Sequence, residues 1–134
     1  MAMAGIFDDP KLVANLKEAV STIRKAMVQI SELSASVSPL NFNQMSRWVD
    51  TKDEHASELI RSVTEYGLCE RMKPVGDPMS AFRKDVDYIA ALQVHHKVML
   101  AAVKCKQTVD LANVDLLEAA VTEMSKMYLP DARL

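Results

Sequence analysis

The sequence has few of the residues that interrupt helices and few of those that favour sheets. Its 134 residues include only 3 glycines, 5 prolines, 3 phenylalanines, 3 tyrosines and 1 tryptophan. Glycine and proline break helices, and aromatic residues are enriched in strands. The shortage therefore argues against a β-rich fold and favours long helices, with a core built from Ala, Leu, Met, Val and Ile.

Cysteine is scarce as well. Cys69 and Cys105 are too few and too widely spaced for a disulfide framework. We expect two reduced thiols and a cytoplasmic location, or the host cytoplasm or virion for a viral protein. The first ten residues, MAMAGIFDDP, lack the basic and apolar regions of a signal peptide. No stretch approaches the length of a membrane span, so no membrane contact is expected.

The balance of charge excludes one further class. A formal net charge of −2 argues against a protein that holds nucleic acid by bulk charge alone. A hydrophobic fraction of 49% and a charged fraction of 25% are ordinary for a globular protein. The length suits one domain, so we expect residues 1–134 to form a single helical domain.

A seven-residue repeat from Phe42 to Tyr66 predicts a helix that packs lengthwise on other helices. Lys52 is the one charged residue in this seam. Either it fixes the register or the oligomeric state of the packed helices, or its aliphatic stem lies over the core while its ammonium reaches Asp53 or solvent. The two rows are Phe42, Val49, Ala56 and Val63, and Met45, Lys52, Leu59 and Tyr66.

Periodicity and capping residues predict an all-α fold, an antiparallel bundle of four helices. Asp9-Pro10 and Asp77-Pro78 each combine an N-cap with a proline suited to the first turn. The third helix is apolar on more than one side, so it is central or covered by a partner. The predicted helices are 10–36, 41–66, 78–109 and 113–129, with a flexible or docking arm at 1–8 and the main connector at 67–77, where Gly67 follows the second helix.

Motifs for catalysis or metal binding are absent from the sequence. His95 and His96 are adjacent, so on a helix they point about 100° apart and cannot chelate one ion from one face. His55 and Glu58 do not form the Glu-x-x-His pattern of carboxylate-bridged metal bundles. The sequence also lacks a nucleophile elbow, a P-loop and a dinucleotide fingerprint. We therefore predict no catalytic residues, no metal and no cofactor.

Charge is segregated along the chain. No acidic residue occurs between Tyr88 and Val109. Three interpretations remain open: the stripes pair within one bundle or are solvated, they pair between copies, or the basic stripe binds a phosphate backbone. The basic stripe is His95, His96, Lys97, Lys104 and Lys106, and the acidic stripe, at i, i+4 spacing, is Asp50, Glu54 and Glu58.

These features predict a non-enzymatic assembly or adaptor protein that acts through protein contacts, as a homo-oligomer. It would be a viral or phage structural or accessory subunit, or a chaperone-like subunit of a larger complex. The alternatives are a nucleic-acid accessory protein that uses the basic stripe, and a bundle that binds a small molecule or cofactor. The predicted protein contacts are Ile6, Phe7, Lys52, Val94, Val98, Asp50, Glu54 and Glu58.

Overall fold

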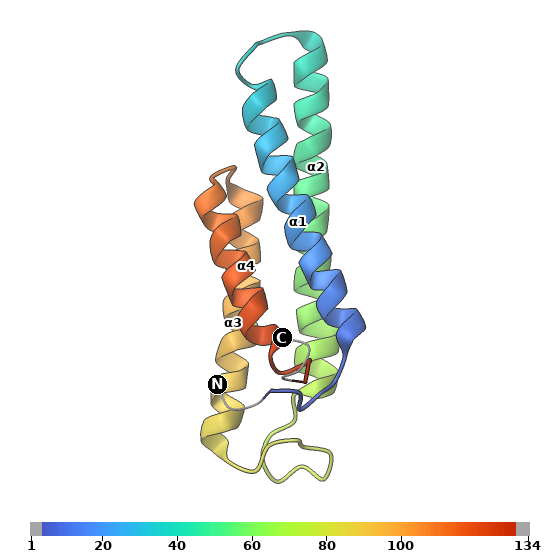
Figure 1. The fold of residues 1–134 in the computed structure, drawn as a ribbon, viewed down its shortest axis with the longest axis vertical. Helices are drawn as coiled ribbons and strands as arrows, with labels where there is room; N and C mark the ends of the chain where they lie inside the picture. The colour runs from blue at the N-terminus through green and yellow to red at the C-terminus, as the bar shows by residue number, and fades with distance from the viewer. Residues whose placement is uncertain (1–3, 131–134) are drawn as a thin grey trace.

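The protein, seen in a computed structural model that describes residues 4–130, is a bundle of four antiparallel α-helices (Figure 1). Each helix packs on two others in a closed ring, α1 on α2, α2 on α3, α3 on α4 and α4 on α1. The predicted fold class is therefore confirmed. In the described residues the elements are α1 (Pro10–Leu33), α2 (Pro39–Arg61), the π-helix η1 (Ser62–Arg71), α3 (Asp85–Gln107) and α4 (Leu111–Ser125).

Side-chain caps set three of the helix starts. Asp9 Oδ1 accepts a hydrogen bond from the Leu12 backbone N–H at 3.1 Å, and Pro10 occupies the first turn of α1, as predicted. The second helix was predicted to begin at residue 41, but the Ser38 hydroxyl accepts from the Asn41 N–H and caps α2, which therefore begins two residues earlier, at Pro39. α4 begins at Leu111, where Asp110 accepts from the Ala112 N–H.

The predicted start of the third helix at residue 78 is wrong, because Asp77-Pro78 forms an isolated turn. Asp77 Oδ1 accepts from the Met79 N–H at 2.8 Å, and the Asp77 carbonyl accepts from the Ser80 N–H at 2.9 Å. The chain then buries Phe82 against the end of the bundle before α3 begins at Asp85. The long connector is therefore 72–84 rather than 67–77.

The predicted helix end at Gly67 is also wrong, because α2 runs on into ten residues of π-helix. π-Helices are rare and often lie at functional sites. Gly67 is buried inside η1, and a Cβ placed there would lie 3.0 Å from the His95 ring and 3.3 Å from the Tyr128 hydroxyl. The missing side chain lets η1 approach these two residues closely.

Lys52 is almost wholly buried, with 2% of its surface exposed. Its ammonium donates to the carbonyl oxygens of Cys105 at 2.7 Å and Lys106 at 2.9 Å, and to Asp53 at 2.9 Å. The expected partner Asp53 is present, but the ammonium does not reach solvent. It satisfies carbonyls in the last turn of α3, where the helix dipole favours a cation.

None of the helices within residues 4–130 combines the length and apolar character required to cross a bilayer.

We expect Lys52→Met to lower the free energy of unfolding by about 1–3 kcal/mol, because it leaves buried carbonyls at the end of α3 without their donor. Lys104→Met, at an exposed position of the same turn, should change it by less than about 0.5 kcal/mol. Urea unfolding followed by circular dichroism measures both. Equal stability of the two variants would contradict the capping role of Lys52.

Candidate functional site

The segment from residue 4 to residue 9 lies across the end of the bundle opposite the α1–α2 turn (Figure 1). Ile6 and Phe7 are half-buried and pack against the protein's own core. Residues 1–3 of the predicted arm fall outside the described residues. Three N–H groups of the segment bond carbonyls that follow α4: Gly5 to Lys126 at 2.8 Å, Phe7 to Met127 at 3.0 Å and Asp9 to Tyr128 at 2.7 Å.

This segment delivers Asp9 to Tyr66 and Arg71 of η1. The Tyr66 hydroxyl donates to Asp9 Oδ2, and Arg71 donates to the same hydroxyl oxygen from Nε at 2.9 Å and Nη2 at 2.6 Å. All three side chains are half-buried. A phenol is thus held between a carboxylate and a guanidinium at the end of the bundle.

The cluster fixes the protonation of its members. Burial raises the pKa of Tyr66, and the hydrogen bond to Asp9 raises it further, against the opposing effect of Arg71. Burial alone would raise the pKa of Asp9, but hydrogen bonds from Tyr66 and the Leu12 N–H and the charge of Arg71 bring it below its ordinary value. At neutral pH Tyr66 is therefore a protonated donor beside an ionised carboxylate.

A second polar pair lies deeper in the bundle. His95, on α3, is fully buried; its Nδ1 lies 2.8 Å from the Ala91 carbonyl and its Nε2 lies 2.8 Å from the Tyr128 hydroxyl. A carbonyl can only accept, so Nδ1 carries the proton and Nε2 accepts from Tyr128. Burial lowers the pKa of His95, which keeps the ring neutral. The Tyr128 ring packs on Phe7 at 5.0 Å between centroids, which places this pair directly beneath the docked segment.

The residues of the predicted basic stripe do not form one continuous surface in the structure. The fully buried His95 does not belong to a basic surface, which corrects that prediction. Lys97 lies 3.6 Å from Glu123 of α4, and Lys106 donates to the Ser57 hydroxyl at 2.9 Å. The exposed members are His96, Lys97, Lys104 and Lys106.

The predicted protein contacts are dispersed as well. Val94 and Val98 face the core and are buried, so they are not available at the surface. Lys52 is buried too, with its ammonium engaged within the chain. The acidic stripe of Asp50, Glu54 and Glu58 is exposed along α2.

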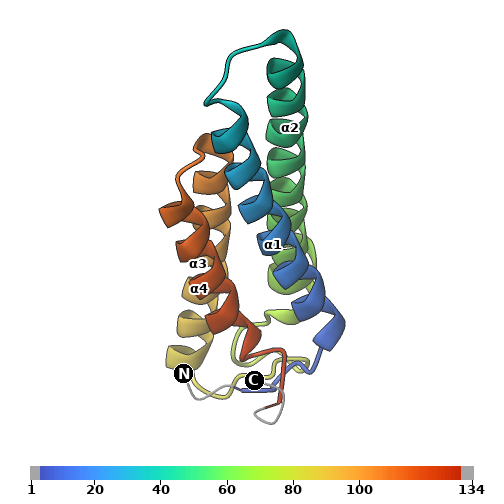
Figure 2. The same cartoon turned by 45° about the horizontal axis from the view of Figure 1, so that its top comes forward.

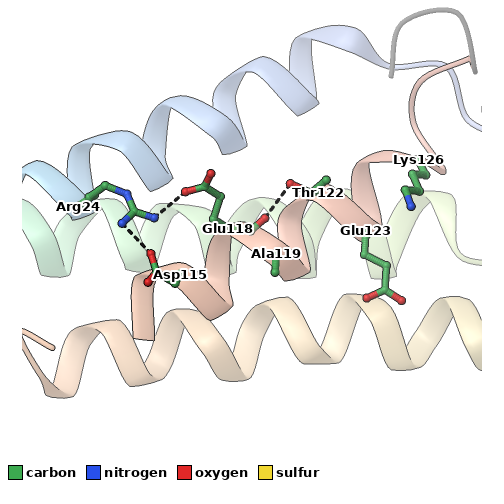
Figure 3. A pocket seen from close by; sticks show the side chains of 7 residues that line it. All are labelled: Arg24, Asp115, Glu118, Ala119, Thr122, Glu123 and Lys126. Atoms are coloured by element: carbon green, nitrogen blue, oxygen red, sulfur yellow. Dashed lines mark hydrogen bonds and ion pairs between the residues drawn. The ribbon is translucent and has the colours of Figure 1, made fainter. Parts of the chain in front are cut away.

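An open groove between α1 and α4 holds a further charged group (Figure 3). Arg24 reaches from α1 to α4, where Nη1 lies 2.7 Å from Asp115 and Nη2 lies 2.6 Å from Glu118. Both carboxylates are more than half exposed, so the contact adds little stability. The Arg24 guanidinium is therefore already paired with two carboxylates, and these two ion pairs connect α1 with α4.

The ligands that a metal would need are not assembled. All 3 histidines and both cysteines of the sequence lie within residues 4–130, and in that range no three His, Cys, Asp or Glu side chains converge as a metal site. Both ring nitrogens of His95 are engaged. Burial raises the pKa of Cys105 to about 11, which keeps it a protonated thiol. Cys69 is exposed on η1, and both thiols are free.

Sequence reasoning missed the polar cluster at the end of the bundle. Tyr66 occupied a seam position and was read as core, and Asp9 was read only as a helix cap. Arg71 fell in the predicted connector. A phenol at the edge of an otherwise aliphatic seam was the one available signal, because a buried tyrosine hydroxyl requires a polar partner.

Comparison with known proteins gives one result. The profile of the family described as nickel-containing superoxide dismutase matches residues 3–131. No curated protein and no solved structure matches the chain significantly. Because the family is one of enzymes, the match overturns the prediction of a non-enzymatic assembly or adaptor protein, together with its viral version.

Nickel is the metal that this family name implies. Imidazole nitrogen suits nickel, and a cysteine binds a metal only as the deprotonated thiolate. Here the buried thiol is protonated, the buried imidazole has no free nitrogen, and no third donor joins either in residues 4–130. The His and Cys residues of this chain therefore do not fit a resident nickel ion.

We expect the free energy of unfolding to fall as the pH drops below about 6.5, by up to about 1.4 kcal/mol per pH unit for His95. The buried ring has a lowered pKa, so below the ordinary value the unfolded chain takes up the proton first. His95→Gln should remove this component, whereas His96→Gln, at the exposed neighbouring position, should retain it. Denaturant titrations over a pH series measure the difference; identical slopes for the two variants would disprove it.

Proposed function

Because the chain belongs to the nickel-containing superoxide dismutase family, we propose that it removes superoxide by disproportionation. In that reaction two superoxide anions and two protons become one dioxygen and one hydrogen peroxide, as one electron passes from the first anion to the second. The single observation that carries the proposal is the family match over residues 3–131.

The polar cluster at the end of the bundle supports the proposal chemically. Superoxide is a small anion, and the proposal assigns its attraction to the half-buried guanidinium of Arg71, whose charge the nearby Asp9 carboxylate partly offsets. The reaction consumes protons, and the Tyr66 hydroxyl is a protonated donor at neutral pH. Asp9 and Arg71 hold that hydroxyl in one orientation. Attraction of the anion and supply of a proton are the roles assigned to these three residues.

The reaction also needs a group that takes up and returns one electron, which is the chemistry that nickel supplies when bound. The His and Cys residues of this chain do not form such a centre, so the proposal assigns them no part in electron transfer. Any redox metal would need donors other than a cluster of His, Cys, Asp and Glu side chains in residues 4–130.

We further propose that the protein acts as a homo-oligomer in the cytoplasm. The two free thiols support a reducing compartment. Uncovered apolar side chains support self-association, because a monomer rarely exposes them in groups. On the outer face of α3 these are Val86, Ile89, Leu100 and Val103.

The activity is tested on the full chain, produced in cells supplied with nickel and analysed for metals by mass spectrometry. Superoxide generated by pulse radiolysis should decay faster with the protein than with the same concentration of the metals found. A folded, metal-analysed protein that leaves the decay unchanged would refute the proposed function.

Two variants test the polar cluster. Tyr66→Phe should slow the disproportionation about a hundredfold through loss of the proton donor, and Arg71→Gln should slow it by up to about tenfold. The matched controls are Tyr88→Phe, on α3, and Arg61→Gln, at the exposed end of α2. Thermal unfolding confirms that each variant is folded. Equal rates for a variant and its control would remove that residue from the site.

A further inference from the structure

The α1–α2 hairpin extends well beyond the α3–α4 turn, as both views of the bundle show (Figure 1 and Figure 2). Lys52 marks the level at which α3 ends, because its ammonium binds carbonyls of the last α3 turn. We call residues 33–49 the hairpin tip. No residue of the hairpin tip is buried, whereas α2 is buried regularly from Lys52 onward.

The seam of α2 continues into the hairpin tip without its neighbour. Ala56 and Val63 are buried in the core, but Phe42 and Val49 of the same row are 57% and 37% exposed. Leu40 and Val37, at the turn, are 66% and 77% exposed. The apolar row therefore runs past the place where α3 stops, so this chain covers only its lower half.

The hairpin tip is also free of charge over most of its length. From Leu33 to Ser46 the sequence contains no Asp, Glu, Lys or Arg, although these make up 25% of the chain. Depletion of charge and exposed aromatic residues mark the centre of protein interfaces. A helix that binds lipid surfaces instead carries Lys and Arg along its polar face. The composition favours a protein partner over a membrane.

We propose that the hairpin tip binds the hairpin tip of a second copy of this chain across a two-fold axis. An uncharged surface meets itself without repulsion between like charges, which a two-fold contact requires. Two antiparallel hairpins restore four helices at a level where each chain supplies only two. Each tip then lies over the partner's α3–α4 turn, where Val109 and Leu111 are each 41% exposed. This inference rests on the proposed self-association and gives it a second surface, beside the outer face of α3.

The test is the molar mass of the full chain, from size-exclusion chromatography with light scattering over a wide range of concentration. The wild type should reach at least twice 14.9 kDa. Leu40→Glu with Phe42→Glu should halve the mass of the wild type without unfolding the chain, because both side chains are exposed. Met79→Glu with Leu116→Glu, at comparably exposed positions outside both the hairpin tip and the outer face of α3, is the matched control and should keep the wild-type mass.

A built-in probe gives a second measurement. Trp48 is the sole tryptophan of the chain, lies in the hairpin tip and is half-buried beneath Lys25, whose ammonium is 5.7 Å from the ring centroid. Its fluorescence should shift to shorter wavelength as the wild type associates, and the shift should disappear in the Leu40→Glu, Phe42→Glu variant.

The outcomes separate the two proposals. A wild-type oligomer that the tip variant leaves intact overturns the hairpin-tip interface and leaves self-association standing. A wild type that stays monomeric at every concentration overturns both. Sedimentation of that monomer with phosphatidylcholine–phosphatidylserine vesicles would overturn the second copy in favour of a lipid surface. None of these outcomes depends on superoxide activity, which is measured separately.

Discussion

Three backbone hydrogen bonds, from residues 5, 7 and 9 to the carbonyls of residues 126–128, hold together the end of the bundle that carries the polar cluster. They attach the beginning of the chain to the end of the last helix, so they close the bundle across its greatest sequence separation. They also place Asp9 where one carboxylate oxygen caps α1 and the other accepts from Tyr66. The polar cluster of Asp9, Tyr66 and Arg71 depends on that attachment. The same attachment positions Phe7 against Tyr128, above His95.

The seven-residue repeats in the sequence were enough to predict the helices but not the residues at which they begin and end. Rows of apolar residues seven apart depend only on helix geometry, so the bundle was accessible. Asp9-Pro10 and Asp77-Pro78 carry the same local signal, yet one opens a helix and the other an isolated turn. The difference lies in tertiary structure, because burial of Phe82 against Phe7 and Tyr88 draws the second segment away from helix.

The candidate site could not be predicted from the sequence for the same reason, because it depends on tertiary contacts. His95 and His96 are neighbours with identical chemistry, and only the fold buries one and exposes the other. The partner that distinguishes His95 is Tyr128, 33 residues away. Tyr66 fitted the apolar seam, so its pairing with a residue 57 positions earlier left no trace in local spacing. The π-helix that carries Tyr66 and Arg71 likewise has no simple signature.

Family membership and side-chain chemistry give different kinds of information about this chain. The family profile follows the whole bundle, which is set by apolar spacing and helix ends. A metal centre depends on a few donor atoms, and the thiols and imidazoles present do not converge within residues 4–130. The polar groups that do converge are the carboxylate of Asp9, the phenol of Tyr66 and the guanidinium of Arg71.

The carbonyl cap formed by Lys52 separates the length of the α1–α2 hairpin from the rest of the bundle. Because the ammonium fixes α2 against the last turn of α3, the part of the bundle between Lys52 and the polar cluster keeps its helix register even if the hairpin tip changes in length. One added heptad in each of α1 and α2, on the turn side of this contact, would lengthen the projecting arm by about 10 Å. The length of the hairpin tip can therefore vary by whole heptads while the polar cluster at the opposite end of the bundle stays unchanged.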